Sequence, residues 1–147
     1  MCIRDSDNSD IAFVNQMRDK IGIFEKVFVW NRDTKIFLAI IKYFEDKKNC
    51  QNDTEVGLVR VILLVENSIR YYSRYLPLLY SEIIKQTQRL ITKDKLDGVK
   101  KILRMRARPK VLLAVSYEEA IEMYEKFKST MLCVISDVKF PDVYKRQ

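Results

Sequence analysis

The chain has 147 residues, of which 48% are hydrophobic and 32% charged, and its formal net charge is +7. This length is sufficient for one modest domain that buries its own core. The chain contains no histidine, which excludes histidine-dependent catalytic triads, histidine-ligated zinc and a phosphohistidine donor within these residues. No apolar stretch reaches the length of a membrane-spanning helix, so we expect no membrane partner.

The two ends of the chain do not have the character of native protein. Residues 1–6 and 143–147 are similar to the translated adapter ends of metagenomic reading frames, so we leave them out of the fold prediction. Without them the formal charge falls from +7 to +5, because Lys145 and Arg146 are removed while residues 1–6 are neutral. We therefore expect the remaining chain to be an internal fragment of a longer protein.

Residues 7–48 predict a short strand followed by an amphipathic helix. The strand is expected within residues 26–30, which are rich in valine and aromatic side chains. Asp33 is the candidate N-cap, since a carboxylate there can accept a free backbone N–H and favours the positive end of the helix dipole. The helix should reach about Lys48, and its apolar residues recur at spacings of three and four: Ile36, Phe37, Ile40, Ile41 and Phe44. Residues 49–57 are polar and rich in turn formers, which predicts a linker.

A long strand-and-helix unit is expected next. Residues 58–65 are almost continuously apolar, which predicts a buried strand, and Ser68 can cap the helix that follows. Helical spacing of apolar residues continues to Ile91, while Pro77 predicts a kink or a break within this helix. The tyrosines at helical spacing in this segment indicate packing against a core or a partner rather than a base-stacking platform: Tyr71, Tyr72, Tyr75 and Tyr80.

Residues 93–110 carry eight basic residues against two aspartates. They predict a turn at residues 93–98, a short basic helix to about Arg106 and a second strand at residues 110–115. A basic block of this kind is found in proteins that bind nucleic acid or an anionic surface. It has few aromatic residues for stacking and no zinc-finger or RNA-binding signature. We therefore favour a solvated helical face and keep a nucleic-acid-binding module as a minor alternative.

The last predicted elements are a helix and a third strand. Ser116 and Glu119 form a capping box. The third strand, residues 132–137, is expected to be buried on both faces, with Cys133 as a small buried hydrophobe. Because Cys50 and Cys133 are isolated and no signal peptide is recognisable, we expect a reducing, cytoplasmic location. The buried face of the helix is predicted from Ala120, Met123, Tyr124 and Phe127.

The alternation of strands and helices predicts an α/β fold. Strand–helix–strand–helix–strand order implies a parallel sheet with right-handed crossovers and a flavodoxin-like beginning. The carboxyl ends of such strands form the ligand crevice, so Glu66 and Asn67, after the first strand, and Asp137, after the third, should share one edge. Carboxylates at one edge can form an acidic pocket for a hard cation and a phosphoryl group.

Two short motifs stand at these strand ends. Residues 61–68 run into Glu66 and Asn67, and residues 136–141 follow the pattern Asp-x-x-apolar-Pro. Both resemble strand ends of a response-regulator receiver (CheY-like) domain. The whole of residues 28–141 resembles the tandem receiver-like region ahead of phosphoenolpyruvate synthase/pyruvate phosphate dikinase-type domains in some large bacterial proteins. The strings that carry this resemblance are residues 29–31, 35–43, 70–80, 85–90 and 103–110.

The resemblance implies a role for each residue at the predicted edge. Asp137 would be the phosphoacceptor and a ligand of Mg²⁺, Glu66 one member of the acidic pair, and the main-chain carbonyl of Lys139 a further ligand. Asn67 stands where the family has its second acid, which implies a weakened Mg²⁺ site. The implied partners are a histidine kinase or phosphotransfer protein as donor, and the neighbouring receiver-like and dikinase-type domains of the same chain.

The same resemblance implies a domain organisation and leaves two main functions open. Residues 7–48 would be the C-terminal tail of a preceding receiver-like domain, residues 49–57 a linker, and residues 58–142 the N-terminal part of a second receiver domain, truncated after its third strand. The switch Ser/Thr and the Lys of the later strands would lie beyond Gln147. This regulatory fragment would not itself be an enzyme. It could be a phosphoacceptor in phosphorelay signal transduction that regulates a linked catalytic domain, or a pseudo-receiver that acts as a non-phosphorylated interaction or dimerisation module.

Overall fold

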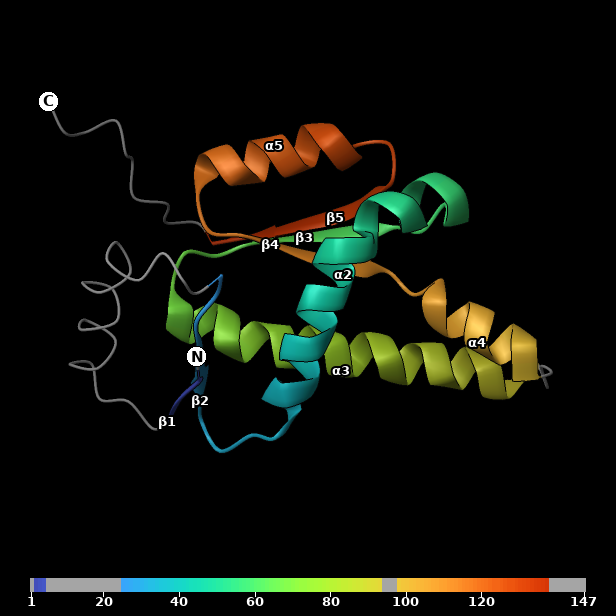
Figure 1. The fold of residues 1–147 in the computed structure, drawn as a ribbon, viewed down its shortest axis with the longest axis horizontal. Helices are drawn as coiled ribbons and strands as arrows, with labels where there is room; N and C mark the ends of the chain where they lie inside the picture. The colour runs from blue at the N-terminus through green and yellow to red at the C-terminus, as the bar shows by residue number, and fades with distance from the viewer. Residues whose placement is uncertain (1, 5–24, 94–97, 138–147) are drawn as a thin grey trace, which may run out of the picture.

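The computed structural model describes residues 2–4, 25–93 and 98–137 (Figure 1). It contains a three-stranded parallel sheet with the order β4-β3-β5. Counted along the chain, this is the order 2-1-3, which is consistent with a flavodoxin-like fold. The prediction of an α/β fold with a parallel sheet flanked by helices is confirmed. The three strands are β3 (Val61–Val65), β4 (Lys110–Ala114) and β5 (Met131–Ser136).

A separate two-stranded parallel sheet lies near the start of the chain. Its strands are β1 (Cys2–Arg4) and β2 (Phe28–Trp30), with Ile3 opposite Val29. β2 confirms the strand expected within residues 26–30. β1 was not expected, because residues 1–6 were left out of the prediction.

The helix after β2 is longer than its sequence pattern indicates. α2 (Lys35–Gly57) has Thr34 as its N-cap, so the prediction of Asp33 at this position is one residue off, although Asp33 Oδ1 does accept the Lys35 N–H at 2.9 Å. The linker predicted at residues 49–57 is wrong, because these residues form the last turns of α2. Cys50 and Thr54, one turn apart, are both buried there, so this polar segment still packs one face against the protein.

The crossover between β3 and β4 consists of α3 (Ile69–Lys93) and α4 (Gly98–Arg106). Pro77 lies inside α3, which continues through it as one helix, so the predicted break does not occur. The short basic helix ending near Arg106 is confirmed. Within the part of the chain that the structure describes, no helix combines the length and apolarity needed to cross a membrane.

α5 (Tyr117–Phe127) begins with the predicted capping box. The Glu119 N–H donates to Ser116 Oγ at 3.1 Å, and Glu119 Oε2 accepts the Val115 N–H at 2.8 Å. The predicted buried face is partly correct. Ala120 and Phe127 are buried and Met123 packs beside them, but Tyr124 is exposed.

The alternating side chains of β3 build two cores. Ile62 and Leu64 face α2 and α3, whereas Val61, Leu63 and Val65 face the layer that contains α5 (Figure 1). The core on the α2 and α3 side also contains Ile36, Tyr43 and Tyr72. Residues expected to be the tail of a preceding domain therefore share one core with β3 and α3, and the described residues show no separation between the two parts.

β5 differs most from its prediction. Its side chains were expected to be buried on both faces, yet Leu132, Val134 and Ile135 are 55%, 45% and 40% exposed. The reason is its position, because β5 pairs with β3 and no described strand pairs with its other side. The prediction that Cys133 is buried is wrong for the same reason.

Cys50 and Cys133 should differ strongly in reactivity. Cys50 is buried, and burial, together with nearby Asp46, raises the pKa of its thiol to about 11, whereas Cys133 is exposed on β5. Because the thiolate is the nucleophile, we expect iodoacetamide at about pH 8 to modify Cys133 at least roughly tenfold faster than Cys50. Peptide mapping over time measures both rates. Equal rates in the native chain would contradict this burial, whereas the urea-unfolded chain should show them equal.

Candidate functional site

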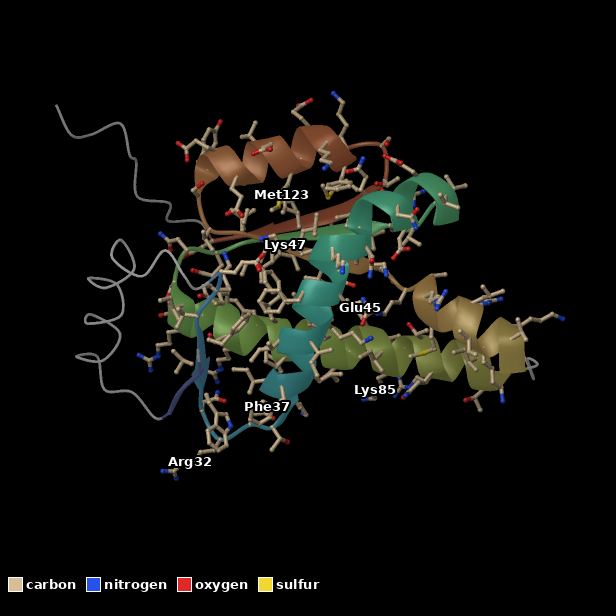
Figure 2. The ribbon with its side chains drawn as sticks, in the orientation of Figure 1. Arg32, Phe37, Glu45, Lys47, Lys85 and Met123 are labelled. Atoms are coloured by element: carbon tan, nitrogen blue, oxygen red, sulfur yellow. The ribbon has the colours of Figure 1, made fainter. Side chains whose placement is uncertain are left out.

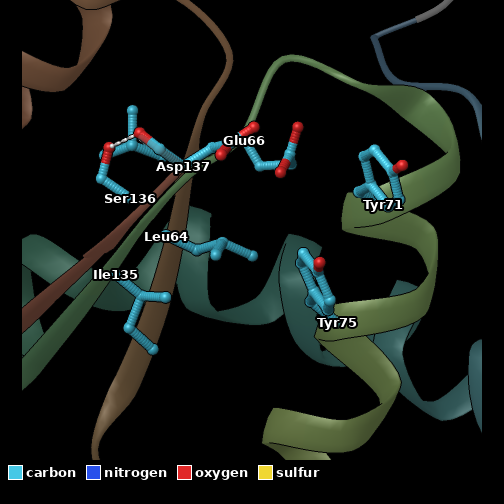
Figure 3. Close-up of a pocket in the computed structure, with 8 residues that line it drawn as sticks. Leu64, Glu66, Tyr71, Tyr75, Ile135, Ser136 and Asp137 are labelled. Carbon is cyan, nitrogen blue, oxygen red and sulfur yellow. Dashed lines mark hydrogen bonds between the residues drawn. The ribbon is translucent and has the colours of Figure 1, made fainter. Parts of the chain in front are cut away.

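An open pocket of about 450 Å³ lies at the carboxyl ends of β3 and β5 (Figure 3). Both predicted carboxylates, Glu66 and Asp137, line it. This is the edge at which a parallel sheet of this order binds ligands. The other residues that line the pocket are Leu64, Val65, Tyr71, Tyr75, Ile135 and Ser136.

Backbone hydrogen bonds hold the two acidic residues in place. The Glu66 N–H donates to the Ala114 carbonyl at 3.0 Å, and the Asp137 N–H donates to the Val65 carbonyl at 3.4 Å. Each bond extends a strand ladder by one residue beyond the strand end. The Glu66 side chain is nearly buried, and its Oε1 accepts the Ser68 N–H at 2.9 Å. One oxygen of Glu66 is therefore fixed at the turn into α3.

Of the other two predicted ligands, one lies outside this pocket and the other outside the described residues. Asn67 directly follows Glu66, but its side chain is exposed and does not line the pocket. Lys139, whose main-chain carbonyl was expected to be a ligand, lies outside the described residues. The structure thus brings together Glu66 and Asp137, without Asn67.

A pair of tyrosines forms the wall of the pocket on the α3 side (Figure 3). The rings of Tyr71 and Tyr75 are stacked, with centroids 6.1 Å apart and planes at 11°. Tyr72 and Tyr80 of the same helix are instead buried in the core. The helical spacing of all of these tyrosines predicts packing residues. The available signal was the position of Tyr71 and Tyr75, four residues apart on one helix face, within the first two turns after a strand end.

The pocket lining fits a hard cation in part. It offers carboxylate oxygens from Glu66 and Asp137, the ligand type that Mg²⁺ prefers, and Mg²⁺ commonly keeps several waters while bound through one or two carboxylates. Among the described residues, no group of three or more His, Cys, Asp or Glu side chains is arranged to hold a metal. The protein-derived ligand set is therefore small.

A second polar cluster lies inside the protein and was missed by sequence analysis. Asp46 of α2 is fully buried and accepts hydrogen bonds from Arg108 Nη1 and Nη2, at 3.0 and 2.7 Å, and from the Tyr80 hydroxyl at 3.1 Å. Burial and the nearby Asp46 carboxylate raise the pKa of Tyr80 above its ordinary range. Lys110 is also buried and pairs with Asp53 at 2.7 Å. No periodicity in the sequence places these distant residues together.

This buried cluster changes how the basic block is interpreted. Arg108 and Lys110 belong to that block, yet both are neutralised inside the protein by carboxylates of α2. Glu45, labelled in Figure 2 on the same helix, lies 3.6 Å from Arg108 and is partly exposed. The prediction of a solvated basic face therefore holds for α4 but not for Arg108, just before β4, or Lys110, the first residue of β4.

α5 and α2 border a smaller cavity on the other side of the sheet. It has a volume of about 260 Å³, and Lys47 and Met123 lie on its wall (Figure 2). Cys50 also lines it, but no group of metal ligands is found there among the described residues. The pocket at Glu66 and Asp137 is therefore the stronger candidate site.

The choice of this pocket as the candidate site rests on the position of Glu66 and Asp137 at the ends of two adjacent strands. No protein-family model, curated protein or solved structure matches the chain.

Proposed function

We propose that this chain is a receiver-like phosphoacceptor module in which Asp137 takes up a phosphoryl group. The observation that carries the proposal is the meeting of Asp137 and Glu66 in one pocket at the carboxyl ends of adjacent parallel strands. The strand order 2-1-3 supports it, since acidic residues after the first and third strands of such a sheet meet at one edge.

The proposed reaction is a phosphoryl transfer to a carboxylate. An Asp137 oxygen attacks the phosphorus of the donor, the bond from phosphorus to the donor nitrogen or oxygen breaks, and an acyl phosphate forms on Asp137. Positioning and charge neutralisation supply most of the catalysis in such transfers. Mg²⁺, when bound, supplies positive charge next to the transferred group. Glu66, whose Oε1 accepts the Ser68 N–H, would be one of the residues that hold that cation, with its carboxylate already oriented by this hydrogen bond.

The partners in this proposal follow from the resemblance noted above. The physiological donor would be a histidine kinase or a phosphotransfer protein. The output would be regulation of a linked phosphoenolpyruvate synthase/pyruvate phosphate dikinase-type protein in the cytoplasm. The module itself would not turn over a substrate as an enzyme.

Phosphorylation by a small donor tests this proposal. We expect intact-mass measurement to show one labile phosphate per chain after incubation with acetyl phosphate and Mg²⁺. The variant Asp137→Asn should take up none, because it lacks the nucleophilic carboxylate. Glu118→Gln, which removes an exposed carboxylate on α5, is the matched control and should be phosphorylated normally. Identical masses of the natural chain before and after incubation would refute the phosphoacceptor role.

A second candidate function is a non-phosphorylated interaction module. It is favoured by the exposure of Asn67 outside the pocket and by the apolar, exposed side chains of β5. Such a pseudo-receiver would keep the fold without the chemistry. Absence of phosphate uptake, combined with self-association that Val134→Lys abolishes, would favour this function over the first.

The residue at position 67 should tune the affinity for Mg²⁺. Asn67 brings no charge, whereas an aspartate adds one negative charge next to Glu66. Because position 67 is exposed and lies outside the pocket lining, the added charge would act on the divalent cation through water, which at about 8 Å contributes about 1 kcal/mol, or roughly fivefold in affinity. We therefore expect Asn67→Asp to tighten Mg²⁺ binding about fivefold by isothermal titration calorimetry. An unchanged dissociation constant would show that Asn67 is not what weakens the site.

A further inference from the structure

α4 presents an apolar face to the outside of the protein. Val99, Ile102 and Leu103 are 72%, 59% and 58% exposed, and no residue of this helix is buried. Their spacing of three and four places them on one side of the helix. We call these three side chains, together with the basic residues of the same helix, the α4 surface. The basic residues are Lys100, Lys101, Arg104 and Arg106.

The α4 surface is separate from the pocket at Asp137. α4 packs against α3 and directly precedes the start of β4, whereas the pocket lies beyond the ends of β3 and β5 (Figure 1). In a parallel sheet the start of one strand and the end of its neighbours lie at opposite edges. A partner on α4 would therefore leave the candidate site open.

The charge of α4 limits what can cover it. The helix has four basic residues and no acidic residue within Gly98–Arg106. A second copy of the chain would bring the same charge to the contact, which like-charge repulsion disfavours. Nucleic acid would neutralise the positive charge but would leave the side chains of Val99, Ile102 and Leu103 exposed to water. A fitting occupant must supply both apolar side chains and carboxylates.

We propose that the α4 surface docks an acidic amphipathic helix of another protein. Its apolar side chains would cover Val99, Ile102 and Leu103, and its flanking carboxylates would pair with the exposed Lys101 and Arg106. A common mode of peptide recognition is the binding of an amphipathic helix through apolar residues at spacings of three and four. The proposal is independent of phosphorylation at Asp137.

A designed peptide provides the probe. It is a helical peptide with leucines at positions i, i+3, i+4 and i+7 and glutamates on the other positions, labelled for fluorescence anisotropy against the full chain. A peptide of the same composition, scrambled so that the leucines no longer share one face, is the reference. We expect the scrambled peptide to bind at least about tenfold more weakly, because it keeps the negative charge but no longer has its leucines on one helix face. Raising the salt concentration should weaken binding of the patterned peptide.

Variants of the exposed side chains locate the binding surface. The double variant Ile102→Ser/Leu103→Ser should weaken binding about tenfold, and Lys101→Glu/Arg106→Glu should do the same and reduce the salt dependence. Val56→Ser, at a side chain that is 79% exposed on α2, is the matched control and should bind normally. Unchanged binding of both double variants would overturn the proposal. Equal binding of the scrambled peptide, or binding to duplex DNA or anionic vesicles with none to the patterned peptide, would overturn it as well.

Discussion

Replacement of Asp46 by alanine is expected to lower the free energy of unfolding by about 3–5 kcal/mol. Asp46 is fully buried and pairs with Arg108, and its carboxylate also accepts the Val111 N–H at 2.9 Å. Removing this carboxylate leaves the buried guanidinium of Arg108 and the Tyr80 hydroxyl without a main partner. The cost of an uncompensated buried charge exceeds the net gain of the original pair, so the loss should be large. Urea unfolding followed by circular dichroism measures it.

Glu45 supplies the matched control for this experiment. It lies next to Asp46 in α2 and contacts the same Arg108, but its side chain is 38% exposed. Because solvent screens such a pair, Glu45→Gln should cost no more than about 1 kcal/mol. If Asp46→Ala also costs less than about 1 kcal/mol, the buried cluster does not hold α2 to β4 as the structure indicates.

A chain that begins at residue 58 is expected to lose cooperative unfolding. α2 contributes Ile36, Ala39 and Tyr43 to the core that contains β3 and α3, and without it one face of the sheet is uncovered. Each of these side chains is at most 2% exposed in the full structure. Burial of large side chains supplies most of the stability of a small domain, so loss of a covering helix should leave an expanded state without fixed packing. Near-ultraviolet circular dichroism and urea titration report that state.

A chain that begins at residue 25 is the control for this truncation. It retains β2 and α2 and should unfold cooperatively, because it keeps every described residue of the core on the α2 and α3 side of the sheet. The result bears on the domain organisation. A cooperative transition in the shorter chain would support the division after residue 57 that the sequence resemblance implies, and would show that α2 is dispensable.

Sequence pattern predicted the strands well where the local signal was strong. β3 is a continuous apolar run that is buried as expected, and β4 begins at Lys110 as predicted. The capping box at Ser116 specified the start of α5 because its hydrogen bonds are local. Glu66 and Asp137 could be placed at one edge because the parallel direction of the strands follows from the alternation of elements.

The features that sequence pattern missed depend on tertiary contacts. Residues 49–57 are polar, but tertiary packing of Cys50 and Thr54 and the pairing of Asp53 with Lys110 keep them helical. The buried partnership of Asp46 and Arg108 spans 62 residues of sequence, which no local pattern can reveal.

The exposure of β5 could not be predicted from its composition. An apolar run indicates a strand that can be buried, but burial depends on which neighbours cover it, and β5 pairs on one side only within the described residues. The same limit applies to Tyr71 and Tyr75. Their spacing indicates one helix face, but only the packing of α3 on the sheet shows that this face borders the pocket.

The measurement that tests the central claim most directly is the location of the phosphoryl group. After incubation with acetyl phosphate and Mg²⁺, borohydride reduction converts the acyl phosphate of an aspartate into homoserine, which peptide sequencing by mass spectrometry can locate. We predict reduction at Asp137 and at no other carboxylate. Reduction at Glu66 or at a surface carboxylate, or no reduction in the natural chain, would contradict the assignment of Asp137 as the phosphoacceptor.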